Sequence, residues 1–171
     1  MTSHFDLPPS PWVRRWSAFI RPGGAVLDVA CGAGRHARWL ATLGFEVDAV
    51  DRAPELFEAP PPGVRLTGAD IESGPWPYAG RRFDAIVVTN YLHRPLLPRL
   101  VDSLEPGGIL LYETFARGNE RFGKPSNPDF LLAPGELLDA VRAKLRVVAY
   151  EDRVVDEPRP AAVQRIAARR E

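Results

Sequence analysis

The residues best suited to chemistry gather between Val26 and Asp51, in the stretch VLDVACGAGRHARWLATLGFEVDAVD. Gly32 and Gly34 form a turn after a short apolar run, and glycine there lets the backbone approach a ligand closely. Asp51 ends the next apolar run, where a carboxylate can accept hydrogen bonds from both vicinal hydroxyls of a ribose. The glycine turn and the acid together predict a site for a nucleotide-like ligand.

Asp28 distinguishes between two kinds of nucleotide site. The spacing Gly32-x-Gly34-x-x-Ala37 also fits the fingerprint of dinucleotide-binding proteins. Asp28, however, stands inside the first apolar run, four residues before the first glycine, where a dinucleotide fold has no need of a carboxylate. The resulting pattern D-x-x-x-G-x-G resembles the first motif of class I S-adenosylmethionine-dependent methyltransferases. The alternative is a glycine turn with scattered acids that bind no ligand.

Parallel strands must position these residues. The sequence predicts a buried strand at 25–29, a helix that opens in the glycine turn and ends at Gly44, and a second strand at 47–51. Further strands are predicted at 64–69, 83–89 and 109–113, and 146–155 and 161–168 predict an antiparallel hairpin because their connection is short. The expected fold class is α/β, a Rossmann-like three-layer sandwich. Its seven-stranded, mostly parallel sheet ends in an antiparallel hairpin, which is the arrangement that the resemblance also implies.

Helices are predicted between these strands. Residues 1–10 form an irregular arm, and 11–20 form an amphipathic helix whose Trp12 and Trp16 face the core or border the cofactor pocket. Residues 53–58 can make a turn or two of helix before three prolines. Longer helices are expected at 94–104 and 136–145.

More site residues are expected where the other strands end, because ligands collect at the carboxyl ends of the strands where the strand order reverses. Asp70 ends the third strand and could bind an adenine edge, as the resemblance also implies, or could form a turn. Asn90, Tyr91 and His93 follow the fourth strand, next to the place of methyl delivery. The residues assigned to cofactor binding are Asp28, Ala30, Gly32, Gly34, Asp51, Arg52, Asp70, Ile71 and Asn90.

Tyr91 and His93 are the candidate catalytic residues. Methyl transfer is an in-line displacement, so a nucleophile that is already ionised needs alignment but no general base, and both side chains would orient it. An oxygen or nitrogen nucleophile would need a base, and imidazole is the side chain that ordinarily titrates near neutrality. A third interpretation is that His93 caps the helix after the fourth strand.

Residues 114–134 predict a lid-like loop. About twenty residues without periodicity is too long for an ordinary connection, and the phenylalanines within it argue against disorder. Arg121 and Lys124, together with Arg94, are assigned to substrate binding, where they would hold a small anion. The alternative is an ordered surface loop.

Composition limits the functional classes. The 171 residues, 45% of them hydrophobic, predict a single methyltransferase domain over 1–171 with no room for a separate substrate domain. Lys+Arg and Asp+Glu both number 22, so no global field attracts nucleic acid or an acidic membrane, and a small-molecule substrate is expected. One cysteine and three scattered histidines predict no metal site. Without a signal peptide or a transmembrane run, the protein is expected to be cytoplasmic, as a monomer or homodimer.

The glycine turn with Arg35-His36 and the following RWLATLGFEVDAVD is similar to the tellurite-resistance methyltransferase group. This resemblance implies methylation of a small soft nucleophile, a chalcogen oxyanion or a thiol, with S-adenosylmethionine as cofactor. The loop after Glu113 has no counterpart that we can match in that group. Methylation of a small oxygen or nitrogen nucleophile remains an alternative, as does a methyltransferase-like subunit that binds without catalysing.

Overall fold

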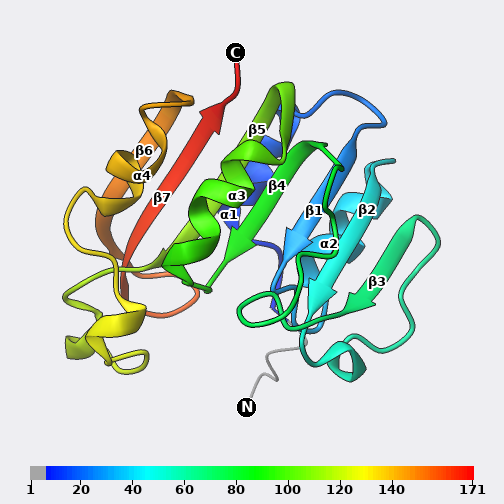
Figure 1. Ribbon diagram of the computed structural model, residues 1–171. Helices are drawn as coiled ribbons and strands as arrows, with labels where there is room; N and C mark the ends of the chain where they lie inside the picture. Colours follow the sequence, from blue (N-terminus) through cyan, green and yellow to red (C-terminus); the bar gives the residue numbers. More distant parts are fainter. Residues whose placement is uncertain (1–6) are drawn as a thin grey trace.

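A seven-stranded sheet in the order β3-β2-β1-β4-β5-β7-β6 forms the centre of the computed structural model, which describes residues 7–171 (Figure 1). Strands β1 to β5 pair in parallel, whereas β7 runs antiparallel to both β5 and β6. The predicted fold class is therefore confirmed, including the terminal hairpin. The strands are β1 (Ala25–Val29), β2 (Glu46–Asp51), β3 (Val64–Gly68), β4 (Phe83–Thr89), β5 (Leu104–Phe115), β6 (Arg146–Val155) and β7 (Ala161–Arg169).

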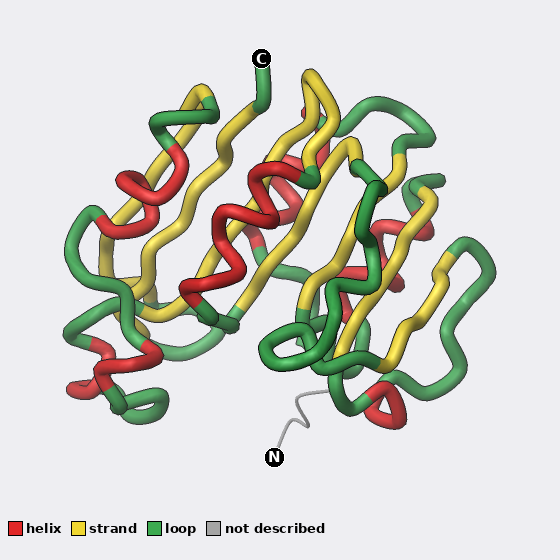
Figure 2. Tube along the Cα trace, in the orientation of Figure 1, coloured by secondary structure: helices red, strands yellow, loops and turns green. Residues whose placement is uncertain are grey.

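Helices cover both faces of the sheet and make three layers. Figures 1 and 2 show α3 and α4 in front of the sheet and α1 and α2 behind it. The α-helices are α1 (Pro11–Trp16), α2 (Arg35–Thr42), α3 (Leu97–Asp102) and α4 (Glu136–Val141). Single 3₁₀ turns are η2 (Ser17–Phe19), η3 (Pro54–Leu56), η4 (Arg94–Leu96), η5 (Asn119–Arg121) and η6 (Pro128–Phe130). Within residues 7–171, no helix has the length and apolar character needed to cross a bilayer.

The central strands are apolar throughout because both of their faces are covered. In β1, Leu27 and Val29 pack under α3 and α4, whereas Val26 packs toward α1 and α2. Strand β4 alternates in the same way, with Ile86 on the first side and Val87 on the second. The sheet therefore forms two hydrophobic layers at once, and the polar groups at the strand ends are left for the site.

The N-terminal helix begins where its sequence predicts. The Oγ of Ser10 accepts a hydrogen bond from Trp12 N at 3.1 Å, and Pro11 occupies the first turn. Helical structure continues through η2 to residue 19. Trp12 and Trp16 are buried, and Trp12 Nε1 donates to the Ile166 carbonyl of β7 at 3.1 Å. Their role is core packing. Of the predicted arm, 1–6 lie outside the described residues and 7–10 are irregular.

Two helices are shorter than the sequence predicts. The helix expected at 94–104 is split into η4 and α3, because Pro95 and Pro98 provide no backbone N–H within its first turns. The helix expected at 136–145 ends at Val141, whose carbonyl accepts the N–H groups of both Lys144 and Leu145. Strand β5 starts at Leu104, earlier than the predicted 109, because Leu104 already pairs with Phe83 of β4.

Candidate functional site

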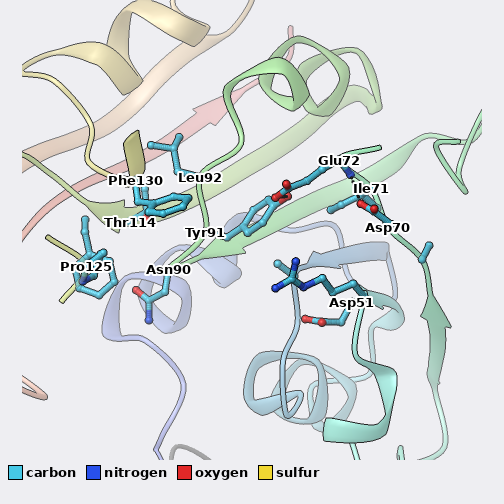
Figure 3. Close-up of a pocket in the computed structure, with 14 residues that line it drawn as sticks. Asp51, Asp70, Ile71, Glu72, Asn90, Tyr91, Leu92, Thr114, Pro125 and Phe130 are labelled. Carbon is cyan, nitrogen blue, oxygen red and sulfur yellow. Dashed lines mark hydrogen bonds between the residues drawn. The ribbon is translucent and has the colours of Figure 1, made fainter. Parts of the chain in front are cut away.

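A cavity of about 480 Å³ lies at the carboxyl ends of the parallel strands (Figure 3). Seven of the predicted site residues line it: Ala30, Asp51, Arg52, Asp70, Ile71, Asn90 and Tyr91. Acidic side chains lie on one side, and Pro125 and Phe130 of the loop after β5 lie on the other (Figure 3). The strand order reverses between β1 and β4, which is where an open parallel sheet collects ligands.

Asp51 connects the end of β2 to the glycine turn. Its Oδ2 accepts a hydrogen bond from Gly32 N at 2.8 Å, and its Oδ1 accepts from Ala53 N at 2.9 Å. Each carboxylate oxygen can accept more than one hydrogen bond, so both keep capacity for a ligand hydroxyl. The carboxylate is thus held in place by the backbone while it faces the cavity.

The structure requires glycine at positions 32 and 34 for different reasons. Gly32 adopts φ +53°, and a Cβ there would meet nothing within 4 Å. Gly34 adopts φ +80°, and a Cβ there would lie 2.3 Å from the ring of Phe57. Neither glycine is among the residues that line the cavity. The sequence predicts that both glycines admit a ligand, but Gly34 is required by packing against Phe57.

Asp28 is buried away from the cavity, with only 1% of its surface exposed. Its Oδ2 accepts a hydrogen bond from Ala37 N of α2 at 3.1 Å. Burial raises the pKa of Asp28 to about 7, against the lowering effects of the Ala37 amide and Arg35. The carboxyl group therefore fixes α2, and with it the glycine turn, relative to β1.

Two residues of the cavity have backbone conformations that are unusual for residues other than glycine. Ala30, which follows β1, has φ +53°, and Asn90, which follows β4, has φ +54°. Such conformations are uncommon, and for alanine they cost about 1–2 kcal/mol. Both residues lie at the ends of the two adjacent strands between which the strand order reverses. Backbone strain therefore concentrates at the centre of the site.

Asp70 forms a turn at the edge of the cavity. Its Oδ1 accepts hydrogen bonds from Glu72 N at 3.0 Å and Ser73 N at 3.1 Å, and these bonds lower the pKa of Asp70. Asp70 therefore forms a turn through its Oδ1, as one of the two interpretations predicts. The same turn brings Ile71 and Glu72 to the cavity. Glu72 was not predicted, although it follows Asp70 by only two positions.

Tyr91 points across the cavity toward Glu72 (Figure 3). Its Oη donates to Glu72 Oε1 at 2.9 Å, and burial, reinforced by Glu72, raises the pKa of Tyr91. The phenol is therefore a hydrogen-bond donor at neutral pH. His93 does not line this cavity, and its Nδ1 lies 3.9 Å from Glu72 Oε2. It precedes η4 without a side-chain capping bond, so the capping interpretation is wrong.

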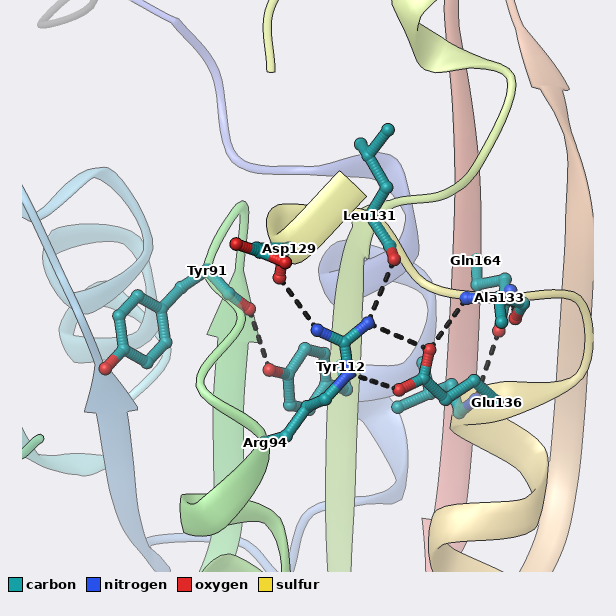
Figure 4. Close-up of polar contacts among 9 residues, drawn as sticks. Tyr91, Arg94, Tyr112, Asp129, Leu131, Ala133, Glu136 and Gln164 are labelled. Carbon is teal, nitrogen blue, oxygen red and sulfur yellow. Dashed lines mark hydrogen bonds and ion pairs between the residues drawn. The ribbon is translucent and has the colours of Figure 1, made fainter. Parts of the chain in front are cut away.

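Arg94 clamps the loop after β5 and does not line the cavity (Figure 4). Its Nη1 donates to the Asp129 carbonyl at 2.7 Å, its Nη2 donates to the Leu131 carbonyl at 3.0 Å, and Nε and Nη2 contact the Glu136 carboxylate. These contacts engage four of the five N–H groups of the guanidinium. The expectation that Arg94 holds a substrate anion is corrected, because the side chain lies outside the cavity and most of its donors bind the loop and Glu136.

The loop after β5 packs against the domain and contributes apolar groups to the cavity. Strand β5 includes residues 114 and 115, so the loop is shorter than the predicted 114–134. Leu131 and Leu132 are buried, and Arg117 N donates to the Leu132 carbonyl at 2.9 Å. Arg121 and Lys124 are exposed and do not line the cavity. The cavity therefore receives Pro125 and Phe130 from this loop, and neither of the expected cations.

A second cavity of about 230 Å³ adjoins the first, and both are lined by Asn90 and Phe115. Glu113, at the carboxyl end of β5, lines only the second one and is 7% exposed. Glu113 was not predicted as a site residue, although an acid at the end of a predicted strand, like Asp51, is a signal for one.

Comparisons with known proteins agree with this geometry. A family model described as a methyltransferase domain matches residues 26–108. A protein-L-isoaspartate O-methyltransferase of Methylorubrum populi is 38% identical over 120 residues, which cover 60% of this chain and 56% of that protein. A ubiquinone biosynthesis O-methyltransferase of Xanthomonas axonopodis pv. citri is 35% identical over 114 residues, which cover 59% of this chain and 47% of that protein. The chain thus spans about half the length of these curated relatives.

Solved structures extend the fold comparison to nearly the whole chain. TehB from Haemophilus influenzae superposes with a TM-score of 0.75 at 20% identity, covering 94% of this chain and 61% of that one. A TehB-like SAM-dependent methyltransferase from Corynebacterium glutamicum superposes with a TM-score of 0.71 at 18% identity. The superposition covers 97% of this chain and 90% of that one. The glycopeptide N-methyltransferase MtfA, complexed with S-adenosylhomocysteine, superposes with a TM-score of 0.68 at 20% identity. The superposition covers 100% of this chain and 93% of that one.

The sheet order, the glycine motif and the family model over residues 26–108 make this chain similar to methyltransferase domains of class I, the S-adenosylmethionine-dependent type. The resemblance to this class that the sequence shows is confirmed, and two of the similar structures are of the TehB type.

Proposed function

We propose that the protein is an S-adenosylmethionine-dependent methyltransferase that transfers a methyl group to a small-molecule nucleophile. The observation that carries this proposal is the cavity at the ends of β1 to β4, with Asp51 and Asp70 at the ends of successive strands. Its volume of about 480 Å³ lies within the range of small-ligand sites. The methyltransferase model over residues 26–108 covers these same strands.

The residues present fit the parts of this cofactor. Asp51 has acceptor capacity for the ribose hydroxyls, and the turn at Asp70 and Ile71 offers a polar edge and an apolar face for adenine. The turn from Ala30 to Gly32 and the strained Asn90 lie beside the place left for the amino-acid part. When bound, the cofactor supplies a methyl group on a sulfonium, which is an activated electrophile.

The chain's own task is then to align a nucleophile and to exclude water. Phe115, Pro125 and Phe130 form an apolar wall near Asn90. Tyr91 offers a hydroxyl donor, and its raised pKa keeps it from acting as a base. His93 lies outside the cavity, so these positions favour a nucleophile that is already ionised. This supports the soft-nucleophile alternative over one that requires a general base.

Calorimetry decides the class of cofactor before any acceptor is known. We expect S-adenosylhomocysteine to bind at one site per chain and NAD to give no heat of binding. Binding of NAD in place of S-adenosylhomocysteine would reject the proposal. Release of S-adenosylhomocysteine with tellurite, selenite, a thiol or a phenol as acceptor then separates an enzyme from a binding subunit.

A further inference from the structure

The second cavity lies between the N-terminal segment 7–11, the end of β5 and the β6–β7 hairpin. Because Asn90 and Phe115 also line the first cavity, the two spaces meet at these residues. A ligand in the second cavity would thus approach the first from the side opposite Asp51 and Asp70 (Figure 3). This is the position that a methyl acceptor needs relative to a cofactor held by those acids.

The floor of this cavity holds charges that neutralise one another. Glu113 is nearly buried and is in contact with Arg165, whose side chain is 14% exposed. Arg165 Nη1 also lies 3.4 Å from Glu151 Oε2. Glu151 does not line the cavity, so on the floor itself Arg165 balances the Glu113 carboxylate and no net negative charge remains there to attract a cationic ligand.

The rim carries positive charge without such partners. Arg14, Arg35 and Arg159 line the cavity, and among residues 7–171 none of them forms an ion pair with a carboxylate. Arg35 Nη1 donates to the Pro8 carbonyl at 2.9 Å, so the side chain is held in place. Burial lowers the pKa of Arg35, and the more distant charges of Glu113 and Asp28 act in the opposite direction. Among the residues that the structure describes, Glu157 is the one further carboxylate on this lining.

The walls of the cavity are apolar and largely lack hydrogen-bond donors. Proline has no N–H, and its rings offer a rigid apolar surface. The apolar residues that form the walls include Leu7, Pro8, Pro11, Pro158, Val155 and Val163. A bare oxyanion would use the arginines and leave these walls facing water. A ligand that uses both features has a charged head and an apolar body.

We infer that the methyl acceptor is a small amphipathic anion that binds in this second cavity, with its carboxylate or other oxyanion on Arg35 and its apolar body against the proline walls. Arg14 and Arg159 add to the attraction at the rim. The atom that receives the methyl group then lies near Asn90 and Phe115, where the cavities meet. This inference rests on the proposed function, whose cofactor would fill the first cavity.

Three probes that differ only in their head group test the inference. Phenylacetate, 2-phenylethanol and phenethylamine are titrated onto the full-length protein saturated with S-adenosylhomocysteine, and binding is followed by saturation-transfer NMR. Phenylacetate should bind about tenfold or more tightly than the alcohol, because a charged hydrogen bond is added, and the amine should bind least.

Variants locate the binding. Arg35→Gln should weaken phenylacetate binding about tenfold or more, and Val163→Trp should abolish it by filling the cavity. Arg153→Gln removes an exposed arginine of β6 outside the cavity and should change nothing. Affinity for S-adenosylhomocysteine is measured for every variant and should stay constant.

Equal affinity for acid and amine, no detectable binding of phenylacetate, or binding unchanged in either Arg35→Gln or Val163→Trp would overturn the inference. These outcomes leave the cofactor result intact. Failure of the wild-type protein to bind S-adenosylhomocysteine would instead overturn the proposed function, so the two failures are distinguishable.

Discussion

Asp28 and His36 should make opposite contributions to the pH dependence of stability. Both are nearly inaccessible to solvent, with 1% and 2% of their surfaces exposed. Burial raises the pKa of Asp28 from 3.8 to about 7 and lowers the pKa of His36 from 6.5 to about 3. His36 must stay neutral because its Nε2 accepts a hydrogen bond from Ser10 N at 3.0 Å.

The signs follow from which state binds more protons. Protonated Asp28 stabilises the folded state fully below pH 3.8, and this contribution is lost as the pH rises to about 7. Neutral His36 contributes stability that is fully present above pH 6.5 and is lost as the pH falls toward about 3. Each effect amounts to about 1.4 kcal/mol per pH unit, so the two nearly cancel in the wild-type protein.

Single substitutions should expose each contribution. When the pH falls from about 6.5 to about 4.5, the unfolding free energy of Asp28→Asn should drop by about 3 kcal/mol more than that of the wild type. The reason is that, of these two groups, only His36 still titrates in this variant. Over the same interval His36→Gln should gain about 3 kcal/mol, because only Asp28 does. Urea unfolding of the three proteins at several pH values measures both slopes. Parallel pH profiles for the wild type and both variants would refute the reasoning.

Two further predictions concern the loop and the histidine. Arg94→Gln should lower stability by about 1–2 kcal/mol and speed limited proteolysis near residues 123–127, since the contacts to Asp129, Leu131 and Glu136 are lost. Unchanged cleavage relative to a control Arg142→Gln, which breaks only an exposed pair, would contradict the clamp. His93→Gln should keep turnover within about tenfold on any acceptor that the wild type methylates, whereas a loss of about 100-fold or more at constant cofactor affinity would identify a general base.

Local patterns were sufficient to predict the sheet and the location of the site. The valine-rich runs at β1 and β4 pack on both faces, so they are apolar throughout and easy to recognise. The short connection before β7 predicts the antiparallel hairpin that closes the sheet. The position of Asp51 could also be predicted, because the carboxyl end of the strand after the glycine turn lies beside that turn in a parallel sheet.

Contacts between distant residues could not be predicted in this way. Arg94 meets partners 35 to 42 positions later in the chain, and no local pattern connects them. Gly34 is explained by Phe57, which follows β2 and is brought to the turn by the pairing of β2 with β1. The second cavity likewise combines the N-terminal segment with the β6–β7 hairpin, whose relative placement depends on the complete sheet.

Asp51 is proposed to bind the ribose hydroxyls of S-adenosylmethionine, and the whole assignment of the cavity depends on it. Asp51→Ala should weaken S-adenosylhomocysteine binding about 10- to 150-fold, the equivalent of about 1.5–3 kcal/mol for hydrogen bonds to a charged group. Asp102→Ala, which removes an exposed carboxylate outside the cavity, should leave the affinity unchanged. Because Asp51 also accepts from Gly32 N, weaker binding alone could reflect a disturbed turn.

Calorimetry with S-adenosylhomocysteine and its 2′,3′-dideoxy analogue separates these causes. The wild-type protein should bind the dideoxy analogue about tenfold or more weakly than S-adenosylhomocysteine, because the acceptors on Asp51 lose their donors. In folded Asp51→Ala this difference should disappear, so that both ligands bind with the same reduced affinity. An undiminished difference between the two ligands in Asp51→Ala would contradict the assignment of the ribose to this carboxylate.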